Sequence, residues 1–271
     1  MVIALVYLRG WIRLWRTSTI PLRFWRLTTF VGALFAVWIV AASPLATLDH
    51  RSLIIHMVKH LLLMTVAAPL MLFAKPEFPL LYGLPHPFPR IDLRAQPAEW
   101  VHLHLQNRTF CWLAGMIAVI AWHIPAAFKL ALRFHWAHGL ENLSFLFAGL
   151  LFWWPVVKAL RSAANSPKWS MVMYLFLATI PCDILSAFLA FCNRVVYTGY
   201  LSATQLFGLS PLDDQQCAGA LMWVWITFAY TVPAVILAIQ VLAPRAQSPK
   251  TLGPLCRLEP VRLSGSEGQG L

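Results

Sequence analysis

The sequence predicts an all-α protein, a polytopic bundle of transmembrane helices. Hydrophobic residues make up 59% of the 271 residues and charged residues only 11%, whereas about a quarter of the residues in a soluble domain are charged. The apolar residues gather in long runs without strand-like alternation, which favours helices over short barrel strands. This composition excludes a soluble enzyme, a disordered chain and a disulfide-stapled secreted module.

Six apolar segments match or approach the roughly twenty residues that a helix needs to cross a hydrocarbon core of about 30 Å. They are Leu27–Ser43, Leu53–Phe73, Thr109–Phe128, Gly139–Val157, Trp169–Phe191 and Cys217–Leu242. We expect one transmembrane domain over residues 1–242. Residues 243–271 contain Ser, Gly and Pro with few large apolar residues, so we expect a disordered cytoplasmic tail there.

Two segments differ from the spans. Met1–Leu8 is apolar but too short to cross a bilayer, and Arg9 follows it, whereas a signal peptide carries its positive charge before the apolar stretch. We interpret this segment as the end of a truncated first helix. Residues 75–108 are rich in proline and predict a cytoplasmic loop with a short interfacial helix near Trp100.

The distribution of Lys and Arg predicts the orientation. Sixteen of the 21 basic residues lie at the start, in loop 75–108, between the fourth and fifth full spans, or in the tail, all on one side, while four lie on the other side and Lys59 lies within a span. Such asymmetry places the richer side in the cytoplasm. The net charge of +11 is spread between apolar runs, so membrane topology explains it better than nucleic-acid binding.

With this orientation, the ionisable residues within the spans lie in the outer halves, where each needs a partner, water or a function. His56 and His60 are four residues apart and share a helix face. His123 lies near the outer end of the next span, and His138 and Glu141 begin the one after. Imidazoles from three helices predict a transition-metal site, and imidazole suits copper. Glu141 would bind the ion or orient a liganding histidine.

Further polar and sulfur groups could contribute to such a site. Thioethers favour Cu(I) in particular, but methionines at helical spacing are more often packing residues. A single histidine near a helix end often has one nitrogen in water, and Lys59 is expected to extend to the interface. The possible accessory residues are Met57, Met64, Asp183, Asp214 and Cys217. The sequence has none of the GxSxG, HExxH, Walker or GxGxxG motifs, so we expect no enzyme.

A set of motifs in order along nearly the whole chain carries a family resemblance. They are Tyr7-Leu-Arg-Gly-Trp11, Ala42-Ser-Pro-Leu45, His56-Met-Val-Lys-His-Leu-Leu-Leu-Met64, Ala68-Pro-Leu70, Trp122-His-Ile-Pro125, His138-Gly-Leu-Glu141, Phe152-Trp-Trp-Pro155 and Asp214-Gln-Gln-Cys-Ala-Gly-Ala-Leu-Met-Trp223. In these motifs the chain resembles the CtaG-like family of cytochrome c oxidase assembly factors associated with the caa3-type oxidase.

The resemblance implies about seven helices in the bacterial inner membrane and a role in making active oxidase, through copper supply or insertion. Its polar motif residues fall on His56, His60, His123, His138, Glu141 and Asp214. The chain departs from the pattern at Asn142, where a second histidine is expected, and in its short first helix.

The leading hypothesis is therefore a non-enzymatic assembly factor that holds copper in an outer-facing histidine cluster and acts on cytochrome c oxidase subunits. A haem-handling membrane protein, with histidines as axial ligands, is the first alternative. A scaffold or transporter without a metal, in which the histidines relay protons or line water, is the second.

Overall fold

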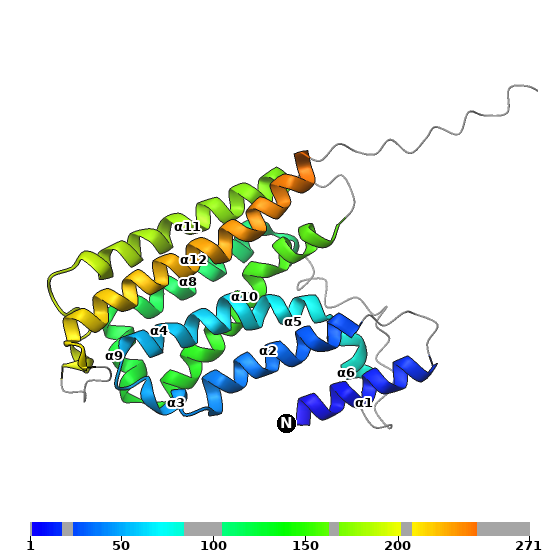
Figure 1. Cartoon of the computed structure of the whole chain (residues 1–271), viewed down its shortest axis with the longest axis horizontal. Coiled ribbons are helices and arrows are strands. Elements are labelled where there is room, and N and C mark those ends of the chain that lie inside the picture. Colours follow the sequence, from blue (N-terminus) through cyan, green and yellow to red (C-terminus); the bar gives the residue numbers. More distant parts are fainter. Residues whose placement is uncertain (1, 18–23, 84–104, 163–167, 202–207, 243–271) are drawn as a thin grey trace, which may run out of the picture. The chain divides into compact units, whose positions relative to one another are not determined.

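The computed structural model describes residues 2–17, 24–83, 105–162, 168–201 and 208–242, and in these ranges every regular element is a helix (Figure 1). The described residues up to Val241 belong to one compact unit. Within the described ranges, five helices are long and apolar enough to cross a membrane, and a sixth span results if one bent pair of helices is counted as a single crossing. The predicted all-α, multi-span fold is confirmed.

The helices follow one another along the chain as α1 Val2–Thr17, α2 Phe24–Ala42, α3 Leu45–Leu48, α4 Leu53–Leu61, η1 Leu62–Ala67, α5 Ala68–Ala74, α6 Glu77–Gly83, α8 Arg108–His123, α9 Pro125–Arg133, α10 His135–Arg161, α11 Lys168–Phe191, η2 Thr198–Tyr200 and α12 Pro211–Leu242. The candidate spans are α2, the continuous stretch α4–η1–α5, α10, α11, α12 and the pair α8 and α9.

The second span contains a π-helical segment, η1, directly after Leu61. Pro69 follows at the start of α5. Proline has no N–H for the carbonyl four residues earlier, and its ring would clash with that carbonyl in a regular α-helix. The wider turn lets the Ala68 N–H bond to the Leu63 carbonyl instead, so the helix continues past the proline.

The third predicted span is interrupted by a bend. α8 ends at His123 and α9 begins at Pro125, and the two helices meet at 75°. Ile124 is extended, with φ −66° and ψ 126°, because the ring of the following proline disfavours the helical conformation at this residue. The predicted unbroken helix over Thr109–Phe128 is therefore wrong at its last turn.

The N-terminal helix is longer than the predicted fragment. α1 continues past Arg9 to Thr17 and packs against α6, a helix within the segment that we expected to be a loop. Backbone contact between the two is close, since a Cβ on Gly10 would lie 1.7 Å from the Pro79 carbonyl oxygen. Arginine favours helix, so the charge ends the apolar run but not the helix. The helix predicted near Trp100 and the predicted tail lie outside the described residues.

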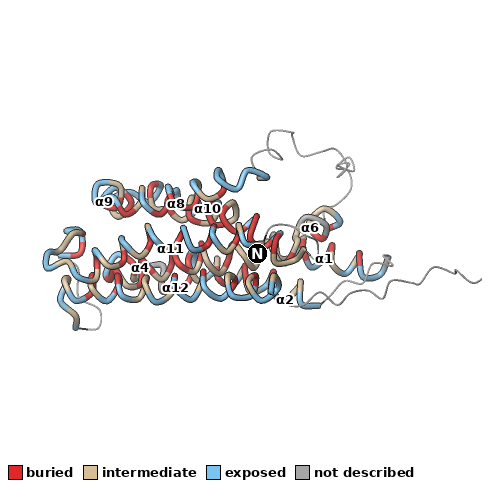
Figure 2. The backbone as a smooth tube through the Cα atoms, turned by 90° about the horizontal axis from the view of Figure 1, so that it is seen from above, coloured by how far each residue is buried: buried red, intermediate tan, exposed pale blue. Residues whose placement is uncertain are grey.

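Buried residues recur on the inward faces of the long helices (Figure 2). The main apolar core joins η1, α8, α10, α11 and α12. At one end of the bundle, which we call the polar end, the α2–α4 connection, α9 and residues 192–201 come together. There the Tyr200 hydroxyl donates to the Asp49 carbonyl (2.8 Å), and the Tyr197 hydroxyl donates to the His123 carbonyl (3.1 Å). These bonds fix the loops around the candidate site.

Candidate metal centre

Close packing of α10 on η1 positions the site. A Cβ on Gly149 would lie 3.0 Å from both the Met64 Cα and the Ala68 Cβ, so glycine favours this approach. Glu141, Phe145 and Gly149 follow one another at four-residue intervals on one face of α10. The face that contacts η1 at Gly149 thus carries Glu141 towards the histidines of α4.

Glu141 is fully buried and faces two histidines of α4. Its Oε1 lies 3.4 Å from the His56 Nε2 and 3.6 Å from the His60 Nε2. Neither approach has hydrogen-bond geometry, and these three atoms are buried without a hydrogen-bond partner, as is the His56 Nδ1. Buried polar atoms are nearly always paired, so such a group requires an explanation such as a bound ion.

The other oxygen of Glu141 belongs to a chain of paired groups. Its Oε2 lies 3.2 Å from the His138 Nδ1, and the His138 Nε2 lies 3.0 Å from the Asp49 Oδ2. The Lys59 ammonium also contacts Asp49 Oδ2 and lies 3.2 Å from the His138 Nε2. Lys59 is therefore buried and paired, and the expectation that it extends to the interface is wrong, because a carboxylate within the fold neutralises it.

Among the residues that the structure describes, two overlapping groups have ligand atoms close enough to hold one ion: Asp49, His56 and His138, and His56, His60 and Glu141. The first group already has a cation beside it, the ammonium of Lys59. The second contains two imidazoles and the Glu141 Oε1, which has no ammonium group beside it, although His138 pairs with the other oxygen of Glu141. Electrostatics therefore favours the second group, and His138 would then orient the Glu141 carboxylate from behind, as outer-shell partners of metal ligands do.

Asp49 lies outside the spans, in the connection between α3 and α4. Burial opposes ionisation of its carboxyl group, but hydrogen bonds from His138 and Lys59, together with their charges, outweigh burial and lower the pKa of Asp49 well below its usual range. The carboxylate is thus ionised, and its Oδ2 is paired with Lys59 and His138, while its Oδ1 is buried without a hydrogen-bond partner, 3.7 Å from the His50 Nε2.

His123 lies apart from both groups. The residue is 9% exposed, its Nδ1 lies 2.7 Å from the Val119 carbonyl oxygen, and its Nε2 is buried without a hydrogen-bond partner. The bond to a carbonyl requires the proton on Nδ1, so in the neutral ring Nε2 carries the free lone pair. His123 and His60 line the same small cavity, of about 20 Å³.

The predicted accessory residues have diverse surroundings. Asp214, in the first turn of α12, accepts hydrogen bonds from the Ser52 hydroxyl (2.8 Å) and the Leu53 N–H (2.6 Å), and so caps α4. Asp183 is partly buried and Cys217 is exposed. None of these three belongs to the two metal-competent groups among the described residues. Met57 and Met64 are buried and line the same cavity as His60.

Aromatic and apolar side chains cover the site at the polar end. The Phe128 ring of α9 lies 4.7 Å from the His56 ring and 4.2 Å from the Tyr197 ring, centroid to centroid. The His138 side chain retains 16% exposure and neighbours His50, whose side chain retains 45%. These two histidines therefore offer a short route from the surface to the site.

Sequence reasoning missed Asp49. It lies between two helices, where an acidic residue is ordinarily solvated, and it is buried beside Tyr200 and Lys59. The signal available in the sequence was Lys59 itself, since a lysine within a span implies a carboxylate nearby.

A bundle of apolar helices that encloses histidines, carboxylates and a lysine at one end defines a multi-pass membrane protein with a buried polar centre. The family model of the cytochrome c oxidase caa3 assembly factor, Caa3_CtaG, matches residues 5–243. The chain belongs to this family, as its motifs predicted. No curated protein and no solved structure matches it.

Proposed function

We propose that this cytochrome c oxidase assembly factor holds one copper ion between His56, His60 and Glu141 and provides it to an oxidase subunit. The observation that carries the proposal is the set of buried nitrogen and oxygen atoms of these residues, which face one another without hydrogen bonds. A cation between the His56 Nε2, the His60 Nε2 and the Glu141 Oε1 would satisfy these three atoms at once.

The donor chemistry supports copper. Two neutral imidazoles and a carboxylate suit a divalent transition metal, and copper(II) is generally bound most tightly among the first-row divalent ions. The family name supplies the second argument, because it names the assembly of a cytochrome c oxidase, and such oxidases contain copper centres as well as haem. The role requires no catalytic step, so we infer a carrier rather than an enzyme.

The charge distribution supports an outward-facing site. At the bundle end opposite the polar end, the Arg161 guanidinium donates to the Leu72 carbonyl (3.3 Å), and Lys168 donates to Gln240 (2.8 Å). Basic loops favour the cytoplasmic side. We infer that the C-terminus is cytoplasmic, that the protein lies in the bacterial inner membrane and that the copper site opens to the opposite side.

Haem is the weaker candidate because the space beside the histidines is small. The cavity at His60 and His123 measures about 20 Å³, whereas pockets for ligands of haem size need about 300 Å³ or more. Phe128 and Phe145 also contact the His56 and His60 rings, with centroids 4.7 and 4.2 Å apart, and so occupy positions that a porphyrin would need.

The test combines metal content and cellular function. Purified protein loaded with copper and passed through a desalting column should retain about one copper per chain, and the double variant His56→Ala, His60→Ala should retain almost none. Cells with the double variant should lose cytochrome c oxidase activity. The control is His135→Ala, an exposed histidine at the start of α10.

Wild-type copper content in the double variant would overturn the proposal. A Soret band in the purified protein that disappears in the double variant would favour haem instead.

A further inference from the structure

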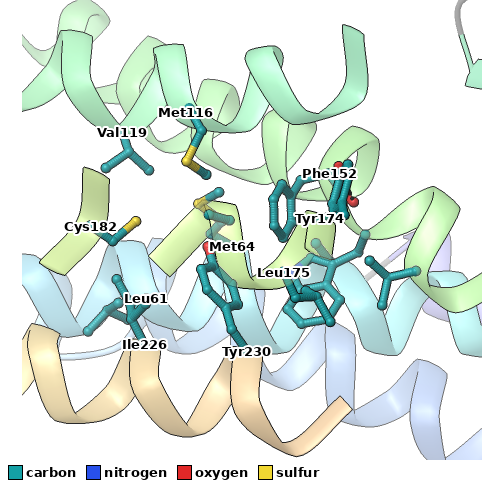
Figure 3. Close-up of a cluster of buried hydrophobic side chains, with 14 of the residues drawn as sticks. Leu61, Met64, Met116, Val119, Phe152, Tyr174, Leu175, Cys182, Ile226 and Tyr230 are labelled. Carbon is teal, nitrogen blue, oxygen red and sulfur yellow. Dashed lines mark hydrogen bonds between the residues drawn. The ribbon is translucent and has the colours of Figure 1, made fainter. Parts of the chain in front are cut away.

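A second buried donor set adjoins His60 and does not include Glu141. The cavity of about 20 Å³ is enclosed by α4, η1, α8, α10 and α12, and Figure 3 shows part of its wall, with Leu61, Met64, Val119, Ile226 and Tyr230 in the core. Its volume suits one atom the size of a water molecule or a metal ion.

The donors in this wall are unusually soft. Three methionines line the cavity, Met57, Met64 and Met222, and each is at most 4% exposed. Two histidines, His60 and His123, complete the set. The lone pair of His123 Nε2 is buried without a partner, because the Val119 carbonyl holds the proton on the other ring nitrogen. The wall has no carboxylate among the described residues.

This set differs in chemistry from the one around Glu141. Thioether sulfur selects Cu(I), imidazole suits copper in general, and a site without a carboxylate adds no negative charge to favour a divalent ion. A buried water would also fit the volume, but it needs two to four polar partners. The wall also contains the hydroxyls of Thr65 and Tyr230, but the Thr65 hydroxyl is already bonded to the Leu61 carbonyl and the Trp225 indole N–H, and the three methionines offer only thioethers, which are weak acceptors.

We propose that His60, His123, Met57, Met64 and Met222 form a second copper position, selective for Cu(I), which shares His60 with the Glu141 group. This inference rests on the proposed copper-carrying function and adds a second position with the oxidation state in which copper is held there. Copper enters this position already as Cu(I), so no electron transfer within the protein is required.

The experiment compares two metals in two variants of the full-length protein in detergent. Under anaerobic conditions, competition with a Cu(I) chelator gives the Cu(I) affinity, and a separate titration gives the Zn(II) affinity. The triple variant Met57→Leu, Met64→Leu, Met222→Leu keeps side-chain volume nearly constant. Met171→Leu is the matched control, since Met171 is buried in the core but does not line the cavity.

The triple variant should bind Cu(I) at least about tenfold more weakly and bind Zn(II) as the wild type does, while Met171→Leu changes neither affinity. X-ray absorption of the wild-type Cu(I) complex should show sulfur neighbours that disappear in the triple variant. Equal Cu(I) affinity in the triple variant and the wild type would overturn the inference, as would loss of both affinities together.

A third variant separates this inference from the proposed function. Glu141→Gln should weaken Zn(II) binding while much of the Cu(I) affinity is retained. If Glu141→Gln weakens copper binding and the triple methionine variant binds copper as the wild type does, the carrier function stands and the second position is wrong. If the wild type binds neither Cu(I) nor Zn(II), both proposals are wrong.

Discussion

Asp49 and Glu141 are both buried carboxylates with 0% exposure, joined through His138, yet their surroundings differ. Asp49 contacts an ammonium group and an imidazole through the same oxygen, Oδ2, so its charge is neutralised within the fold, although its Oδ1 is buried without a hydrogen-bond partner. Glu141 has one oxygen on His138 and directs the other towards two imidazole nitrogens without hydrogen bonds. The first arrangement contains a buried ion pair, and the second is the ligand set that we propose for copper.

The difference shows that burial of a carboxylate does not by itself indicate a metal site. A lysine in the same group marks the structural case, because its ammonium supplies the positive charge that a metal ion would otherwise bring. Mutations that change each carboxylate or its partner can therefore separate the stability of the bundle from the copper binding that we propose.

The largest effect is expected for Lys59→Met. Loss of the ammonium leaves Asp49 buried without its main counter-charge, and breaking a buried pair from one side typically costs about 3–5 kcal/mol. The free energy of unfolding in detergent should fall by this amount. The double variant Lys59→Met, Asp49→Asn should recover part of the loss. A loss below about 1 kcal/mol in the single variant would show that Lys59 is not needed to neutralise Asp49.

Glu141→Gln should weaken the binding of copper(II). The amide keeps the shape and can still hydrogen-bond to His138 but removes the charge, so copper(II) should bind about 100-fold more weakly, or about 2.7 kcal/mol. The control Asp213→Asn changes an exposed carboxylate in the first turn of α12 and should leave the affinity as it is. Competition titration with a copper(II) chelator measures both variants.

His138→Asn should have a smaller effect on copper. His138 joins the two carboxylates, at 3.0 Å to Asp49 and 3.2 Å to Glu141, and outer-shell partners of metal ligands typically contribute about 10–100-fold in affinity. We expect about tenfold weaker copper(II) binding because Glu141 loses its orientation but keeps its charge. A loss as large as that of Glu141→Gln would instead indicate that His138 binds the ion directly.

The smallest effect is expected for Asp214→Ala. Asp214 caps α4 from another helix, and loss of a capping side chain costs about 1 kcal/mol. The thermal midpoint should fall slightly, and the copper(II) affinity should stay close to that of the wild type. An affinity loss comparable to that of Glu141→Gln would instead show that Asp214, one of the polar motif residues of the family, contributes to copper binding.

Much of the fold could be predicted from the sequence, because a run of apolar residues that spans a bilayer satisfies its backbone groups as a helix. The four-residue spacing of His56 and His60 and the three-residue spacing of His138 and Glu141 also sufficed to place these side chains on common faces. The sequence did not predict how each helix is rotated about its axis or where the loops lie. His123 therefore lines the methionine cavity and does not face Glu141. Asp49 is buried beside Tyr200, a residue that is distant in sequence.

The most direct test of the account is an anomalous scattering map at the copper edge from crystals grown with copper(II). The account predicts a peak within bonding distance of the His56 Nε2, the His60 Nε2 and the Glu141 Oε1. A peak beside Asp49 and His138, or no peak near either carboxylate, would contradict it.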